Sequence, residues 1–367
     1  MATSPFYPTD PLVLPVRLHL QPRRVALGLG AVATLATVVA VTGAPVGTFA
    51  AALERVAAAD PLLVGLGVLA EVGSFAGYVA LTWLVVGREA PRVTPAVSAH
   101  ITLAGTAVNR LLPTAGLGGI GLTLWALRHA GLSKARATST LLTFLVVLYT
   151  VFLGALLATG LAALGGSAGD APAWTGLGLT LLGGGAIAVG FLIGLLGPTR
   201  LAAARGGAAP GRLRGAAMTL AESVRGAAAV LRSGDPRLFG ALAWWGFDLA
   251  VLAAAFAAFG DAPAAGVIAL AYFAGIVANT IPVPGAVAGG MTGVLLLCGV
   301  PADLALPAVL AYRAISLWVP VPLGAAAMVG LQRTVRTWAA QDALGGHPMA
   351  ARPATVATRR STSSVAV

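Results

Sequence analysis

The sequence predicts an all-α protein that crosses a membrane several times. Three observations predict this class: 58% of the 367 residues are hydrophobic, only 10% are charged, and the apolar residues gather in stretches long enough to cross a bilayer. A soluble domain carries about 25% charged residues, so a chain of this length could not cover its surface in water with so few. The apolar stretches predict six full spans and two re-entrant hairpins.

Six stretches have the roughly 20 largely apolar residues that a transmembrane helix needs. They cover residues 25–46, 61–87, 138–164, 175–197, 238–260 and 304–331. The first follows a leader, residues 1–24, that contains Arg17, Arg23 and Arg24. It is longer than the apolar core of a cleaved signal peptide, so we expect it to stay in the protein as an anchor. Residues 25–331 therefore form one transporter-like membrane domain.

Two further apolar regions, residues 94–130 and 263–299, are each broken in the middle by Pro and Gly. Their second arms, 117–130 and 286–299, have 14 residues each, which as helices would span about 21 Å. The hydrocarbon core of a bilayer is about 30 Å thick. We therefore expect hairpins that return to the side they entered from. Full crossing by both arms, with about eight to ten crossings in all, is the alternative.

Basic residues predict the orientation. With a cytoplasmic N-terminus, the Arg and Lys residues of the segments between spans fall inside, with Arg55 as the exception, and the segment 198–237 is a basic cytoplasmic loop. The outer segments instead carry Glu54, Asp60, Asp170, Asp261 and Asp303. This is the positive-inside pattern, and it accounts for the net charge of +11 without a nucleic-acid partner. It predicts a multi-pass protein of the cell (inner) membrane with both termini in the cytoplasm. The tail, residues 332–367, is predicted to be disordered.

The two broken regions resemble each other. The tip of the first holds Asn109, Arg110, Pro113, Gly116, Gly118 and Gly119. The tip of the second holds Asn279, Pro282, Pro284, Gly285, Gly289 and Gly290. In both, Pro-x-x-Gly is followed 14 or 15 residues later by a glycine, Gly131 or Gly299. The charge pattern makes the first hairpin enter from the cytoplasm and the second from outside, which is the inverted repeat of many transporters.

Tips of this kind leave backbone groups that lipid cannot satisfy, so they are expected to face protein or water. Two inverted tips that meet at mid-membrane would form one polar site. The short arms would also point helix N-termini at that site, which favours an anionic group such as a phosphate.

Apart from Arg128, which is predicted to lie at the cytoplasmic end of the first hairpin, the predicted spans and hairpins contain four charged residues: Glu71, Arg110, Asp248 and Arg313. A charge at the membrane centre costs about 2.5–3.5 kcal/mol on insertion scales, so such residues face a partner or a cavity. Arg110 and Arg313 are predicted to hold a phosphate, because a guanidinium can donate two parallel hydrogen bonds to its oxygens. Glu71 and Asp248 are the candidate charge partners, and ion pairs among the four residues are the alternative. The predicted substrate-binding residues are Asn109, Arg110, Pro113, Gly116, Gly118, Gly119, Asn279, Pro282, Pro284, Gly285 and Arg313.

No motif predicts an enzyme. Residues 116–121 match the dinucleotide pattern G-x-G-x-x-G, but they follow Pro113 in an apolar hairpin rather than a strand, so we reject that interpretation. The chain lacks the phosphate-binding loop G-x-x-x-x-G-K-[ST], and its scattered histidines and single Cys298 have no metal-ligand spacing. We expect no catalytic residue, no cofactor and no metal.

Residues 109–131 and 281–331 resemble the membrane region of lysylphosphatidylglycerol synthases, a region that defines a wider flippase-like family. The first family motif is similar to Leu112-Pro113-Thr-Ala-Gly116-Leu-Gly118-Gly119 with Gly131. The second is similar to Ile281-Pro282-Val-Pro284-Gly285, Gly299-Val300, Tyr312-Arg313 and Pro320 through Gly324. The resemblance implies movement of a lipid, often one with an aminoacylated or sugar-bearing headgroup, between leaflets.

Two features depart from the family pattern. Family members commonly place a Glu a few residues after the second Pro-Gly, whereas residues 289–293 here contain no acid. The synthases also continue into a soluble aminoacyl-transfer domain, whereas a short tail follows the membrane domain here, so we expect no synthase activity.

The sequence thus predicts a translocase that moves a phospholipid or glycolipid headgroup through a central polar site, with membrane lipids as its partners. Two alternatives remain: a secondary transporter of a small solute, and a non-transporting membrane subunit that docks a glycosyltransferase or synthase.

Overall fold

The computed structural model describes residue 54 and residues 58–111, 116–167, 169, 171–203, 211–260, 262–280 and 285–344. Within these residues the regular structure is helical, without a strand. The helices in chain order are α3 (Pro61–Glu89), α4 (Pro95–Leu111), α5 (Leu117–His129), α6 (Lys134–Ala162), η1 (Ala163–Ser167), α7 (Ala173–Ala203), α8 (Gly211–Arg232), η3 (Pro236–Leu238), α9 (Phe239–Ala257), α10 (Ala265–Ala278), α11 (Ala286–Leu297), α12 (Ala302–Trp318) and α13 (Pro320–Leu344).

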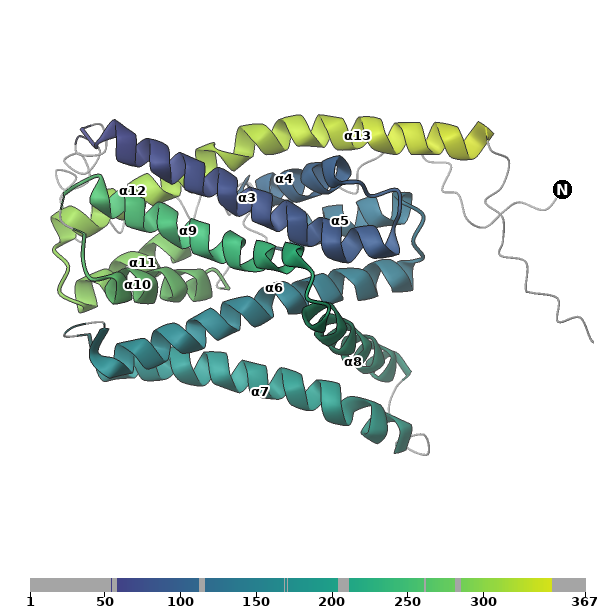
Figure 1. Cartoon of the computed structure of the whole chain (residues 1–367), viewed down its shortest axis with the longest axis horizontal. Helices are drawn as coiled ribbons and strands as arrows, with labels where there is room; N and C mark the ends of the chain where they lie inside the picture. Colours follow the sequence, from purple (N-terminus) through teal and green to yellow (C-terminus); the bar gives the residue numbers. More distant parts are fainter. Residues whose placement is uncertain are drawn as a thin grey trace, which may run out of the picture.

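Long apolar helices form the body of the molecule (Figure 1). The described residues contain five helical segments long and apolar enough to cross a membrane. The predicted spans 61–87, 138–164, 175–197 and 238–260 correspond to α3, α6, α7 and α9. The predicted span 25–46 lies outside the described residues. The chain is a multi-pass membrane protein, as the sequence predicts.

Polar side chains fix where two of these helices begin. The Asp60 carboxylate accepts a hydrogen bond of 2.8 Å from the backbone N–H of Leu62, and Pro61 occupies the first helical position of α3, where no N–H is needed. The Ser133 hydroxyl caps α6 in the same way, accepting from the N–H of Arg136 at 3.3 Å. Both helices therefore begin at a residue that replaces the missing hydrogen-bond partners of the first turn.

The last predicted span, 304–331, is divided between two helices. α12 ends at Trp318 and α13 begins at Pro320. Proline has no N–H to donate, so Pro320 does not continue the hydrogen-bond pattern of α12 and instead occupies the first position of a new helix.

The prediction of a disordered tail from residue 332 is wrong for residues 332–344, because α13 continues to Leu344. Ala327, Leu331, Val335 and Trp338 recur every three or four residues on one face of α13, and all four are buried. α13 lies along α4 (Figure 1). Near its end the Asp342 carboxylate accepts two hydrogen bonds from the Arg92 guanidinium, one of them 3.0 Å long. Residues 345–367 lie outside the described residues.

The segment 198–237 is largely helical rather than a loop. α7 extends to Ala203, and α8 packs against α6 and α7. The Ser223 hydroxyl of α8 donates to the carbonyl of Ser139 in α6 at 3.3 Å, and Ala221 and Ala227 are buried. Small residues on one face of α8 allow this contact.

The two broken regions are hairpins of short helices. α4 and α5 lie in the half of the molecule that holds α8 and the end of α3, whereas α10 and α11 lie in the other half (Figure 1). The second arms, α5 and α11, have 13 and 12 residues, or about 20 and 18 Å as helices, too short to cross about 30 Å of hydrocarbon. The hairpins therefore enter the bundle from opposite ends.

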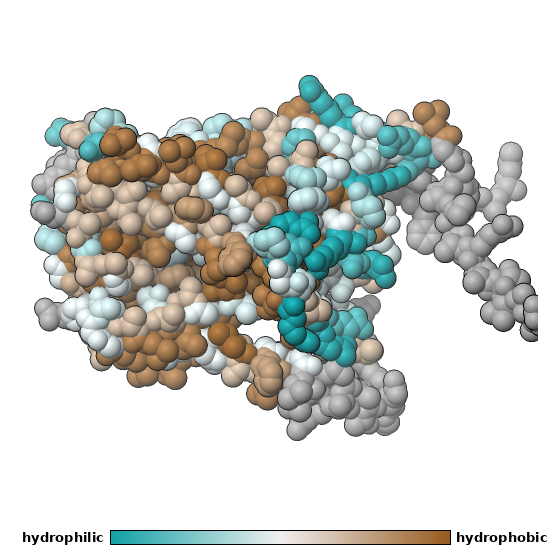
Figure 2. All heavy atoms as spheres, in the orientation of Figure 1, coloured by the Kyte–Doolittle hydropathy of each residue, from teal (hydrophilic) through white to brown (hydrophobic). Residues whose placement is uncertain are grey.

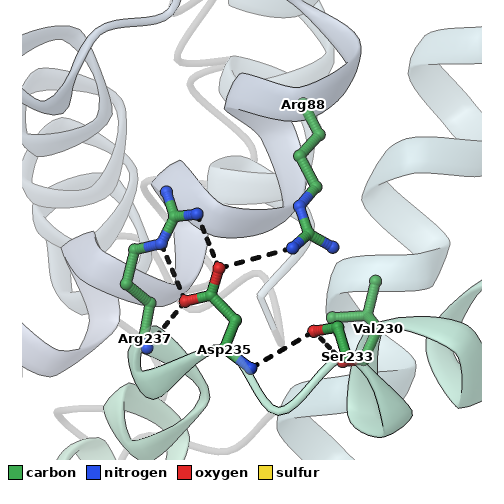
Figure 3. A network of polar contacts seen from close by, with 5 residues as sticks. All are labelled: Arg88, Val230, Ser233, Asp235 and Arg237. Atoms are coloured by element: carbon green, nitrogen blue, oxygen red, sulfur yellow. Dashed lines mark hydrogen bonds and ion pairs between the residues drawn. The ribbon is translucent and has the colours of Figure 1, made fainter.

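The end of the molecule that holds α8 carries most of the charge. On the face seen in Figure 2, hydrophobic side chains cover most of the surface and hydrophilic side chains gather at this end. Asp235, which precedes η3, accepts hydrogen bonds from Arg237 at 2.7, 2.9 and 3.0 Å and from Arg88 of α3 at 3.3 Å (Figure 3). The side-chain hydrogen bond from Arg237 is the largest cause that lowers the pKa of the Asp235 carboxyl from 3.8 to about 2.

Candidate functional site

Two carboxyl groups are buried where α3, α9, α10 and α12 meet. Glu71 of α3 is 1% exposed and Asp248 of α9 is 4% exposed. The Asp248 Oδ2 atom accepts a hydrogen bond of 2.7 Å from the Tyr272 hydroxyl of α10 and one of 3.1 Å from the Tyr312 hydroxyl of α12. Both tyrosines are fully buried. Four helices thus contribute side chains to one polar centre within an otherwise apolar bundle.

The two carboxyl groups lie close enough to each other to share a hydrogen bond. One oxygen of each group, Glu71 Oε2 and Asp248 Oδ1, is buried and has no hydrogen-bond partner among the described residues. The Ser316 hydroxyl, one turn after Tyr312 on the same face of α12, is buried and unpartnered as well. Buried polar atoms are costly unless paired, so the two unpartnered carboxyl oxygens mark a place where a ligand or a proton completes the structure.

Two arginines lie beside the carboxyl pair. Arg110, in the last turn of α4, is within electrostatic range of Glu71, Asp248 and both tyrosines, and Arg313 is within range of Arg110. Both arginines are partly buried. In the described part of the chain neither forms an ion pair with a carboxylate, so the alternative of structural ion pairs does not describe the observed geometry. Two guanidinium groups therefore face the polar centre with hydrogen-bond donors to spare.

The tip of the first hairpin is held by a side chain. The Asn109 side-chain oxygen accepts a hydrogen bond of 2.7 Å from the backbone N–H of Gly119, in the first turn of α5. A Cβ atom at Gly119 would lie 2.8 Å from the carbonyl oxygen of Gly105 and would overlap the Asn109 amide, so only glycine fits. α5 itself begins after Gly116, whose φ of 88° is the left-handed conformation that glycine adopts without strain.

The second hairpin repeats this backbone plan. α11 begins after Gly285, with a φ of 84°, and Gly131 and Gly299 end the two second arms with φ values of 101° and 77°. A Cβ atom at Gly290 would lie 3.3 Å from the Cα of Gly275, as Gly119 lies against Gly105. The predicted repeat therefore extends to the close approach of the arms.

Sequence reasoning missed Gly105 and Gly275, although a pattern was available to find them. Both first arms contain Gly-x-x-x-Asn, with Gly105 before Asn109 and Gly275 before Asn279. It also missed Tyr272, and it named Tyr312 only as part of the family motif Tyr312-Arg313, without a role in the site. Tyr312 precedes Arg313 directly, and Tyr272 lies two helical turns before Asn279.

The structure brings some predicted site residues together and leaves others apart. Glu71, Asp248, Arg110 and Arg313 share one centre, and Gly116, Gly118, Gly119 and Gly285 lie at the starts of α5 and α11. The Asn279 side chain is exposed and forms no hydrogen bond to a described residue. Pro113, Pro282 and Pro284 lie outside the described residues. Within the described ranges, no group of three or more His, Cys, Asp or Glu residues is placed to hold a metal ion.

The match to a known family covers this site. The family model described as the lysylphosphatidylglycerol synthase TM region matches residues 25–324, a range that includes both hairpins and α12. A comparison with curated proteins finds no match.

Proposed function

We propose that this chain, which belongs to the family of lysylphosphatidylglycerol synthase TM regions, moves the headgroup of a phosphate-bearing lipid between the two leaflets of the cell membrane and catalyses no chemical step. The family is a membrane domain that is often linked to lipid or flippase-like roles. In this proposal both termini lie in the cytoplasm, on the side of most basic residues, and membrane lipids are the partners.

The observation that carries the proposal is that Arg110 forms no ion pair with a carboxylate among the described residues. Its guanidinium ends the first arm of a hairpin, close to a second arginine and to buried acceptors, and it has no carboxylate ion partner among the described residues. A guanidinium within a membrane is costly unless its hydrogen-bond donors are paired. A lipid phosphate supplies the negative charge and the oxygens that a guanidinium binds best.

The two hairpins provide a path along which a lipid headgroup could cross the membrane. The two hairpins lie in opposite halves of the bundle (Figure 1), and Arg110 of the first lies within electrostatic range of Tyr272 in the second. A headgroup could therefore pass from one tip to the other through a polar centre, while its acyl chains stay in the bilayer. Small movements of the short arms, rather than of full spans, would then open the polar centre first to one side of the membrane and then to the other.

The test uses purified protein in liposomes that contain a phospholipid with a fluorescent headgroup. A membrane-impermeant quencher reports how fast protected lipids reach the outer leaflet. We expect Arg110→Gln to slow this rate about tenfold or more, because a hydrogen bond to a charged group contributes about 1.5–3 kcal/mol and 1.4 kcal/mol corresponds to tenfold.

Arg128→Gln is the matched control, because Arg128 is an exposed arginine in the last turn of α5, away from the polar centre. Its rate should equal that of the unchanged protein. Equal rates for the Arg110 and Arg128 variants would remove the phosphate-binding role of Arg110. Uptake of soluble phosphate esters without any lipid movement would instead identify a solute transporter.

A further inference from the structure

We propose that Glu71 and Asp248 together bind one exchangeable proton, and that this proton crosses the membrane with the lipid phosphate, so that a proton gradient drives translocation. The coupling rests on the function proposed above, whereas the proton site itself can be tested without it.

The hydrogen-bond inventory of the pair calls for a donor. Asp248 Oδ2 already accepts from Tyr272 and Tyr312, while Asp248 Oδ1 and Glu71 Oε2 have no partner in the described structure. Both residues are more than nine-tenths buried, and their carboxyl groups lie within hydrogen-bond reach of each other. Two ionised carboxylates have only acceptors, whereas one proton turns one of them into a donor to the other. A single proton on the pair therefore supplies the hydrogen-bond donor that the unpartnered carboxyl oxygens lack.

The charged groups around the pair make the net charge of the polar centre depend on this proton. Two charged groups act on Glu71: Asp248 and Arg110. Arg313 lies within electrostatic range of both Arg110 and Asp248. The remaining titratable neighbours are the hydroxyl groups of Tyr272 and Tyr312. If both carboxyls were ionised, they would cancel the two arginines and leave no attraction for a phosphate. With one proton bound, the centre keeps one positive charge in excess.

Proton and phosphate then favour each other's binding. A phosphate held at Arg110 places a negative charge beside the pair, which makes loss of the proton harder. By thermodynamic linkage, the bound proton strengthens phosphate binding by the same factor. The two ligands would therefore enter and leave the centre together, as co-transport requires.

Infrared spectroscopy tests the proton site directly. We expect the purified protein at neutral pH to show the C=O stretching band of a protonated carboxylic acid, and this band should shift in D₂O because the proton exchanges. Glu71→Gln and Asp248→Asn should each abolish it. Glu89→Gln, which changes an exposed carboxylate paired with Arg136 at 3.6 Å, should leave it in place. Absence of the band in the unchanged protein, or its survival in both variants, would overturn the proton site.

A transport measurement tests the coupling. In the liposomes described above, a pH gradient should speed lipid movement severalfold in the direction of proton flow, and Glu71→Gln should remove this dependence. Lipid movement that ignores the gradient in the unchanged protein would overturn the coupling and leave the lipid translocase standing. Absence of lipid movement would overturn the translocase and the coupling together, while the infrared band would decide the proton site separately.

Discussion

The two hairpins share a backbone plan but differ in chemistry. Each second arm begins after a left-handed glycine, Gly116 or Gly285, and each is packed against a glycine of its first arm. The first hairpin carries Arg110 and is fastened by the Asn109 side chain. In the second, residues 265–297 include no charged side chain.

Their packing differs as well. A Cβ atom at Gly275 would lie 3.0 Å from the Val287 carbonyl oxygen and against Met291, whereas one at Gly105 would meet no atom closer than 3.7 Å. The repeat thus preserves how the chain turns within the membrane. The charge and the tightness of packing are set separately in each copy, so the hairpins are not interchangeable.

Exchanging the charge between the tips is the strongest test of this difference. Arg110→Thr combined with Thr280→Arg moves the arginine to the residue that follows Asn279, the counterpart of Asn109. We expect lipid translocation to fall about tenfold or more, as in the single Arg110 variant, because it is Arg110 of the first tip that lies within electrostatic range of the carboxyl pair. Recovery of the original rate in the double variant would show that the tips are equivalent.

The difference in packing predicts unequal effects of alanine. Gly275→Ala should lower the free energy of unfolding by about 1–3 kcal/mol, because the added methyl group overpacks the second hairpin. Gly105→Ala, in the same position of the first hairpin, should be neutral or slightly stabilising. Thermal unfolding in detergent measures both, and equal losses would contradict the difference in space around Gly105 and Gly275.

The shared backbone predicts equal effects at the two turns. Gly116→Ala and Gly285→Ala meet no neighbouring atom within 4 Å, so only the left-handed conformation opposes the side chain. Each should cost about 1–2 kcal/mol. The same unfolding measurement applies, with Gly65→Ala as the control, because Gly65 lies in α3 and also has open space around it. A cost at one turn alone would break the symmetry of the repeat.

The asparagines should differ by a smaller amount. Asn109→Ala removes the hydrogen bond to the Gly119 N–H and should cost about 0.5–1.5 kcal/mol. Asn279→Ala removes no hydrogen bond to a described residue and should change stability little. If the two losses were equal, the second asparagine would have a partner of similar strength.

The charged end provides a reference outside both hairpins, with the smallest expected effect. The hydrogen bonds from Arg237 depress the pKa of Asp235 in the folded protein to about 2, from 3.8. The contribution of Asp235 to stability is therefore complete above about pH 4 and is lost as the pH falls toward 2. Asp235→Asn should slightly lower the unfolding temperature at neutral pH and equal the unchanged protein near pH 2. A difference that persists there would show that the ion pairs are not its cause.

Local features of the sequence were enough to predict most of the fold. Hydropathy located the spans that became α3, α6, α7 and α9, because an apolar stretch of sufficient length has few other stable forms in lipid. Glycine and proline located both hairpins, because only glycine adopts the left-handed turns at Gly116 and Gly285 without strain. The four charged residues of the polar centre were also identified, because charges within apolar stretches are rare and need a partner.

Only the tertiary structure decided which helix faces meet. Nearly every face of these helices is apolar, so periodicity could not show that Tyr272 and Tyr312 point at Asp248, or that the four charged residues converge without ion pairs. The continuation of α13 to Leu344 was missed for a related reason. Its outer face is polar, and it is the packing of its inner face along α4 that makes it helical. Composition and spacing act within one segment of chain, whereas the site brings together groups up to about 240 residues apart, such as Glu71 and Tyr312.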